Sequence, residues 1–214
     1  MTGAAVALLL ATLAVAVVDW WAVATDRRPV EYVAKPATMV VLIAAALALD
    51  PVSGTQRAWF VAALVLSLAG DVFLMLPRDL FVPGLASFLL GHLAYIAGLW
   101  TGDTSTAGLV LGIVLIAVAL PLLGGRILRA VRTGDEPELL APVAVYVAVI
   151  SAMVVSAGAS GQPLALVGAL SFYASDAMIA WGRFIRELPH GRLAVMVTYH
   201  LAQVALVASL TTSG

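Results

Sequence analysis

Long apolar runs, separated by short breaks rich in proline, glycine and charged residues, extend through most of this sequence. A helix needs roughly 20 apolar residues to cross the hydrocarbon core of a bilayer. The runs lie near residues 3–24, 36–50, 57–76, 83–100, 106–123, 139–157, 162–182 and 192–210. Only 11% of the residues are charged, against roughly 25% in a soluble domain. The sequence therefore predicts an all-α, polytopic membrane bundle of about eight transmembrane helices, with residues 1–214 forming a single integral membrane domain.

Prolines and loop composition set the expected helix boundaries. Pro36, Pro83 and Pro142 each lie where a proline in the first helical turn is tolerated, which predicts helix starts at these points. The longest connection, residues 124–138, is basic and then acidic, so we expect a solvated connector. No segment has the length of a separate soluble domain.

The basic residues predict the orientation in the membrane, because cytoplasmic loops carry an excess of Lys and Arg. Of the eleven basic residues, Arg57 stands alone on one side of the predicted bundle, and the other ten lie on the opposite side. The sequence predicts a protein of the cell (inner) membrane, with cytoplasmic basic loops and both termini outside. The absence of cysteine excludes thiolate nucleophiles and Cys-bound metals, and a net charge of -1 gives no indication of nucleic-acid binding.

The third and fourth runs resemble the seventh and eighth. Gly70-Asp71 corresponds to Ser175-Asp176, and the run from Gly91 to Ala97 corresponds to that from Tyr199 to Ala205. The Asp-to-His spacing is 21 residues in one half and 24 in the other. Both halves run in the same direction, so the pattern suggests a parallel four-plus-four repeat about an axis along the membrane normal.

Polar residues from several runs fall at one depth. At about 1.5 Å rise per residue, they lie roughly 10–14 Å from the cytoplasmic helix ends. A charged group deep in lipid costs about 2.5–3.5 kcal/mol, so such groups usually face the bundle interior and serve a function. Asp19 adjoins Trp20 and Trp21 and also fits an interfacial belt. The residues in this predicted layer are Asp19, Asp71, His92, Asp176, Tyr199 and His200.

At these residues the chain resembles the YhhN-type lysoplasmalogenase family, small multi-span membrane proteins. The matching stretches are Lys35-Pro36, Ser67 to Met75, Phe81 to His92 with Tyr95, Ser175 to Ala180 with Arg183-Phe184, and Tyr199 with Gln203. The resemblance covers nearly the whole chain. Trp181-Gly182 departs from it, because a more polar residue is expected before Arg183.

The resemblance implies hydrolysis of the vinyl ether bond of a lysoplasmalogen to a fatty aldehyde and a glycerophospho-alcohol. It also implies that Asp71 and Asp176 are the catalytic pair. Protonation of the vinyl ether β-carbon gives an oxocarbenium ion that water captures, and the resulting hemiacetal collapses. One carboxyl can donate the proton while the other steadies the cation and deprotonates water, with no cofactor or metal. Which aspartate is the acid stays open.

Further polar residues have expected supporting roles in this reaction. Lys35, Arg78 and Arg183, near the cytoplasmic mouth, are candidates for the substrate phosphate. The single lipid chain would lie among apolar helix faces of the bilayer-embedded bundle, and the oligomeric state is left undetermined. The expected supporting residues are Ser67, His92, Tyr95, Tyr199, His200 and Gln203.

Two other readings of the acids remain open from the sequence. Asp71, Asp176, His92 and His200 could together hold zinc in a metal-dependent lipid hydrolase. Membrane-buried acids in a parallel repeat also fit a proton-coupled transporter of small molecules. A chelator test separates the first of these from metal-free catalysis.

Overall fold

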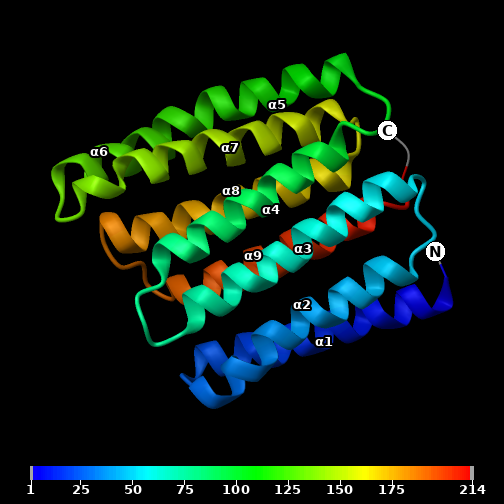
Figure 1. The fold of residues 1–214 in the computed structure, drawn as a ribbon, viewed down its shortest axis with the longest axis horizontal. Coiled ribbons are helices and arrows are strands. Elements are labelled where there is room, and N and C mark those ends of the chain that lie inside the picture. Colours follow the sequence, from blue (N-terminus) through cyan, green and yellow to red (C-terminus); the bar gives the residue numbers. More distant parts are fainter. Residues whose placement is uncertain (1, 213–214) are drawn as a thin grey trace.

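In the computed structural model, which describes residues 2–212, eight helical segments are long and apolar enough to cross a membrane (Figure 1). All described elements are helical. Their bounds are α1 Gly3–Ala24, α2 Arg28–Ala48, α3 Gly54–Met75, α4 Phe81–Leu99, α5 Thr106–Ala119, α6 Gly125–Thr133, α7 Leu140–Ala159, α8 Pro163–Phe184 and α9 Gly191–Ser209. The fold class predicted from the apolar runs is confirmed.

Burial in this bundle differs from that in a soluble protein, because large apolar side chains are exposed on its outside and charged side chains are buried inside it. Leu10 and Val33 are more than 60% exposed, whereas Asp19 and Asp71 are almost completely buried. Apolar side chains on the outside fit a hydrocarbon solvent, and polar side chains inside avoid it. The protein is therefore a multi-pass membrane protein.

Short side-chain caps define several helix starts. Thr2, Ser53 and Ser105 each accept a hydrogen bond from the backbone N–H three residues later. Each cap satisfies a backbone donor that the first helical turn leaves unpaired. The caps lie in loops at the same end of the bundle as both termini in Figure 1.

The start of α2 differs from the prediction at Pro36. The helix begins at Arg28, with Pro29 in its first turn, and Pro36 lies inside it. Pro29 lacks an N–H at a position where none is needed, so it permits the earlier start. As a consequence, Lys35 lies seven residues inside the helix instead of at its mouth.

The connector expected at residues 124–138 is also mostly helical. A π-helical turn, η1 (Leu120–Gly124), joins α5 to α6, so residues 106–133 form one long segment interrupted at Pro121. A 3-10 turn, η2 (Pro137–Leu139), then leads into α7. The basic residues of this region, Arg126, Arg129 and Arg132, are exposed on a helix, so most of the expected connector is helical.

Helix packing follows a two-fold pattern. In the first half of the chain, α1 packs on α2 and α3 packs on α4. In the second half, α5 packs on α7 and α8 packs on α9 in the same way. Likewise, α2 contacts α3 and α9, while α7 contacts α8 and α4. In Figure 1, α5 and α7 lie on one side of the central four helices and α1 and α2 on the other, with all axes roughly parallel. This arrangement agrees with a parallel four-plus-four repeat about an axis along the helices.

Candidate active site

Asp71 is held by a lysine and a tyrosine inside the bundle. On α3, its Oδ2 accepts a 2.6 Å hydrogen bond from the hydroxyl of Tyr199, on α9. Its Oδ1 lies 3.1 Å from Nζ of Lys35, on α2, and the Lys35 and Asp71 side chains are only 8% and 2% exposed. The site therefore contains a buried ion pair in which both carboxylate oxygens of Asp71 are engaged.

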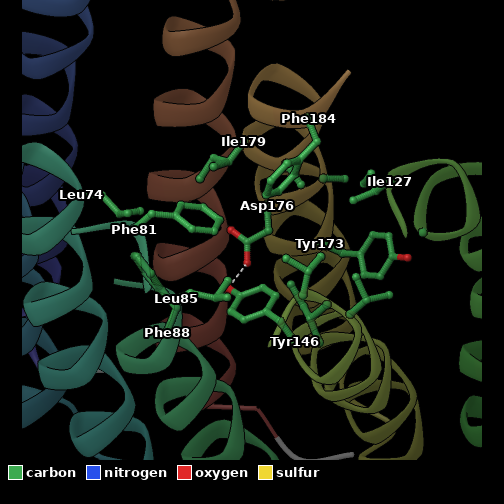
Figure 2. A pocket seen from close by; sticks show the side chains of 16 residues that line it. Leu74, Phe81, Leu85, Phe88, Ile127, Tyr146, Tyr173, Asp176, Ile179 and Phe184 are labelled. Atoms are coloured by element: carbon green, nitrogen blue, oxygen red, sulfur yellow. Dashed lines mark hydrogen bonds between the residues drawn. The ribbon is translucent and has the colours of Figure 1, made fainter. Parts of the chain in front are cut away.

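Asp176 has a different set of partners. On α8, its Oδ2 accepts a 2.5 Å hydrogen bond from the hydroxyl of Tyr146, on α7 (Figure 2). His92, on α4, has its Nε2 at 3.7 Å from the same oxygen, and neither ring nitrogen of His92 has a hydrogen-bond partner within residues 2–212. The basic neighbour of Asp176 is thus an imidazole, where Asp71 has an ammonium group.

A chain of aromatic contacts links the two acids. The ring of Tyr199, which binds Asp71, lies 5.3 Å from that of Phe172, centroid to centroid. Phe172 lies 4.7 Å from the ring of His92, the neighbour of Asp176. These edge-on contacts favour a rigid arrangement. Asp71 and Asp176 therefore belong to one continuous polar–aromatic cluster.

The cluster follows the two-fold pattern of the helices. Asp71 is held from α9 and α2, and Asp176 is approached from the corresponding helices α4 and α7. Tyr95 and Gln203, at corresponding positions of α4 and α9, hydrogen-bond to each other through the Tyr95 hydroxyl and the Gln203 amide oxygen. Side chains at equivalent positions meet in this way close to a two-fold axis. Tyr95 and Gln203 therefore mark where the two halves join.

The remaining residues of the predicted layer have structural contacts of their own. Nδ1 of His200 accepts a 3.0 Å hydrogen bond from the indole N–H of Trp20, so His200 faces α1 and not Asp176. Ser67 is buried against Gly91, where an added Cβ would lie 3.3 Å from its Oγ. Asp19 is fully buried, with neither carboxyl oxygen paired inside the described part of the chain, and this position does not fit an interfacial belt.

The three residues predicted to bind phosphate do not come together. Lys35 is buried beside Asp71, and Arg78 is exposed in the loop after α3. Arg183 forms ion pairs with Asp79 at 3.1 Å and Glu136 at 2.7 Å, and its guanidinium lies 4.1 Å from the centroid of the Phe81 ring. Hydrogen bonds from Arg183 lower the pKa of the Asp79 carboxyl. Arg183 thus ties together the loops after α3 and α6.

The donors proposed for zinc are also divided. His92 is next to Asp176, whereas His200 is bonded to Trp20 and Asp71 to Lys35. Within residues 2–212, no three His, Asp or Glu side chains gather in a group that could hold a metal ion. The arrangement therefore does not form the ligand set considered from the sequence.

An apolar pocket opens onto Asp176. Its lining residues come mainly from α3, α4, α6, α7 and α8, and among the described residues that line it only Asp176 has a carboxyl group (Figure 2). Tyr146 lines it as well, and the sequence reasoning missed this residue. The sequence does contain an indication of its role, because Tyr146 is the only tyrosine of its apolar run and lies at the depth of the other polar residues.

A second, more polar pocket lies at the basic end of the bundle. It is formed by the starts of α2 and α9 and the ends of α1, α3 and α8, and Lys35 lies in its wall. Leu74 and Ile179 line both pockets. The apolar and polar spaces therefore adjoin at these two side chains, one helical turn beyond Asp71 and Asp176 respectively.

With this geometry established, comparison with known proteins identifies the family. Residues 30–210 match the YhhN family. This chain belongs to the YhhN family. The match spans seven of the eight transmembrane segments and contains both halves of the polar–aromatic cluster.

Several relatives of this YhhN protein carry the name lysoplasmalogenase. Lysoplasmalogenase TMEM86B of Homo sapiens is 36% identical over 157 residues, which cover 73% of this chain and 65% of the relative. Lysoplasmalogenases of Mycobacterium bovis and Mycobacterium tuberculosis are each 38% identical over 181 residues, covering 80% of this chain and 67% of theirs. The chain thus spans about two thirds of the length of these relatives. No solved structure matches it significantly.

Proposed function

We propose that this YhhN protein hydrolyses the vinyl ether bond of lysoplasmalogens, releasing a fatty aldehyde and a glycerophospho-alcohol. The observation that carries the proposal is a pair of differently partnered acids inside the bundle: Asp176 lines an apolar pocket, and Asp71 is paired with Lys35, which lies in the wall of an adjoining polar pocket. A single-chain phospholipid likewise joins an apolar hydrocarbon chain to a polar head group. The relatives named lysoplasmalogenase support the same substrate class.

The two aspartates suit different steps of this reaction. An unpaired carboxylate is costly in apolar surroundings, so the uncharged acid is the form that fits the pocket around Asp176. The Asp71 carboxylate is balanced by the Lys35 ammonium group. We therefore assign proton donation to Asp176 and stabilisation of the cation to Asp71.

In the proposed reaction, the Asp176 carboxyl gives its proton to the vinyl ether β-carbon as the C=C electron pair forms the new C–H bond. The α-carbon becomes an oxocarbenium ion, and a water oxygen attacks it while a carboxylate takes the water proton. The hemiacetal then breaks its bond to the glycerol oxygen, which receives that proton, while the hydroxyl gives its own proton to the Asp176 carboxylate as the aldehyde C=O forms. One water is consumed, and both acids return to their starting states.

Tyr146 and Tyr199 act as positioning residues in this scheme. Each hydroxyl donates to one oxygen of an aspartate, Tyr146 to Asp176 and Tyr199 to Asp71. His92 has a free ring nitrogen 3.7 Å from Asp176 Oδ2, a distance that leaves no direct hydrogen bond. We propose that His92 orients the attacking water or the Asp176 carboxyl.

The distribution of charges supports one orientation in the membrane. Ten of the eleven Lys and Arg residues lie toward one end of the bundle, and without the buried Lys35 there are still nine. We propose that this end faces the cytoplasm of a cell (inner) membrane protein, so the polar pocket opens on the cytoplasmic side. An enzyme reporter that works only outside the cytoplasm should therefore be active when it is fused to the C-terminus.

The test is aldehyde release by purified protein from a lysoplasmenyl lipid, beside its saturated alkyl-ether twin, with and without a chelator. Aldehyde should appear from the vinyl ether alone, and a chelator should not change the rate. Asp71→Asn and Asp176→Asn should each lower kcat at least roughly 100-fold, the usual contribution of a general acid or base. Asp103→Asn, in an exposed loop, is the matched control.

Three results would contradict different parts of the proposed function. Folded protein that releases no aldehyde would overturn the proposed reaction and favour a transport function. Loss of the rate on chelation would indicate metal-dependent hydrolysis. Near wild-type activity in both aspartate variants would show that the catalytic pair is misassigned.

A further inference from the structure

The polar pocket at the basic end is lined in part by charged side chains that are almost completely buried. Lys35 and Glu31 lie in its wall with side chains only 8% and 9% exposed. Arg28 and Arg192 reach it from the starts of α2 and α9, and Glu187 from the loop after α8. Cationic and anionic groups therefore line the same pocket.

These charges form a connected network. Arg192 pairs with Glu31 at 2.6 Å and with Asp26 at 3.2 Å, and Arg28 lies 3.7 Å from Glu31. A guanidinium has five N–H donors, so both arginines retain donors for a further acceptor. The network holds their side chains in place and leaves hydrogen-bonding capacity toward the pocket.

We propose that this pocket binds the head group of the lysolipid and selects a phosphodiester that carries a primary ammonium group. The inference rests on the proposed function and deepens it by naming the head-group class. Arg28 and Arg192 take the phosphodiester oxygens, because planar guanidinium groups match phosphate geometry. Glu31 and Glu187 accept hydrogen bonds from the ammonium group.

The lining also distinguishes ethanolamine from choline head groups. A quaternary ammonium donates no hydrogen bond and is usually held against aromatic faces. The only ring in the pocket wall, as drawn from the described residues, is the imidazole of His190. A primary ammonium can instead donate to carboxylates, which the wall supplies. An ethanolamine head group should therefore bind better than choline.

The pocket lies where the head group must be for the proposed reaction. Leu74 and Ile179 belong to both pockets, so a lipid with its head group in the polar pocket and its chain in the apolar one passes between them. In a lysoplasmalogen the vinyl ether joins these two parts. Because Leu74 follows Asp71 by three residues and Ile179 follows Asp176 by three, a bond held between Leu74 and Ile179 would lie about one helical turn from both acids.

The experiment compares kcat/KM for three vinyl ether substrates: the phosphoethanolamine lysolipid, its phosphocholine analogue and 1-alkenylglycerol, which has no phosphate. The wild-type protein should prefer phosphoethanolamine over phosphocholine by roughly tenfold. Arg192→Gln should lower the ratio of phosphoethanolamine lipid to 1-alkenylglycerol by roughly ten- to a hundredfold, as loss of charged hydrogen bonds does. Glu187→Gln should narrow the preference for ethanolamine over choline. Arg186→Gln, an exposed arginine outside the pocket wall, is the matched control.

Several outcomes would overturn the head-group site. It is wrong if Arg192→Gln lowers activity on all three substrates equally, or if the wild-type protein treats ethanolamine and choline lipids alike. If Arg192→Gln fails to fold, Arg28→Gln, whose side chain is 51% exposed, takes its place.

The proposed head-group site can also be tested separately from the proposed reaction. Calorimetric binding of glycerophosphoethanolamine to the wild-type protein measures the site without any turnover. Binding that Arg192→Gln weakens, in a protein that releases no aldehyde, would retain the site and overturn only the proposed reaction. Aldehyde release without such binding would overturn the site and retain the reaction.

Discussion

Removal of the Lys35 ammonium group should leave the Asp71 carboxylate as an uncompensated buried charge. In Lys35→Met, the new side chain has similar length and no charge, so it fills the same space. The 3.1 Å contact with Asp71 is lost, and the carboxylate keeps only the hydrogen bond from Tyr199. We expect lower stability and lower activity together.

The size of the effect follows from the burial of both partners, whose side chains are 8% and 2% exposed. Breaking a buried ion pair by removing one partner typically costs about 3–5 kcal/mol. For a chain of this size, each kcal/mol corresponds to roughly 2–4 °C in Tm. Lys35→Met should therefore melt roughly 6–20 °C below the wild type.

The double variant Lys35→Met/Asp71→Asn separates stability from catalysis. It removes both charges and keeps an oxygen that can accept the Tyr199 hydrogen bond, so most of the lost Tm should return while aldehyde release stays absent. Thermal unfolding in one detergent at one scan rate measures the first effect, with Arg186→Met as the exposed control. A Tm for Lys35→Met within about 2 °C of wild type, or a double variant no more stable than the single one, would refute the buried-pair reasoning.

Two further predictions concern the packing of the helices and the loop contacts. Gly108→Ala should destabilise the protein by about 1–3 kcal/mol in thermal unfolding, because the added Cβ would lie 2.1 Å from the Gly158 carbonyl oxygen, whereas Gly102→Ala, with nothing within 4 Å, should be neutral. Equal Tm values for these two variants would contradict the close contact of α5 with α7. Arg183→Gln should lower Tm slightly without changing the preference for phosphoethanolamine lipid over 1-alkenylglycerol, since Asp79 and Glu136 already engage its guanidinium. Because Arg183 lowers the pKa of Asp79, this loop contact is intact at neutral pH, and its contribution to Tm should disappear as the pH falls through that lowered value.

The spans and the polar layer could be read from the sequence because the bilayer constrains both. A membrane demands long apolar helices, and it makes a deep charge conspicuous. Asp71 and Asp176 stand out on these grounds, and the structure places both inside the bundle. Depth alone does not fix which side chains meet, since that depends on how each helix is rotated about its axis.

The misread features have specific physical causes. Pro36 follows a loop-like stretch and so resembles a first-turn proline, but Pro29 occupies that position, and Lys35 therefore lies deeper in the helix than the sequence predicts. Arg183 was assigned to phosphate because the sequence does not reveal that Asp79 and Glu136 converge on it from two loops. Tyr146 was overlooked because an isolated tyrosine in an apolar run is less conspicuous than a charge.

The meeting of an apolar and a polar space at Leu74 and Ile179 also bears on where the products go. Under the proposed reaction, cleavage at this junction leaves the fatty aldehyde in the apolar pocket and the glycerophospho-alcohol in the polar one. The aldehyde can partition into the bilayer, and the water-soluble product can diffuse into the aqueous phase at the basic end. Separate exits would keep the aldehyde carbonyl away from the primary amine of an ethanolamine product, with which it could otherwise condense.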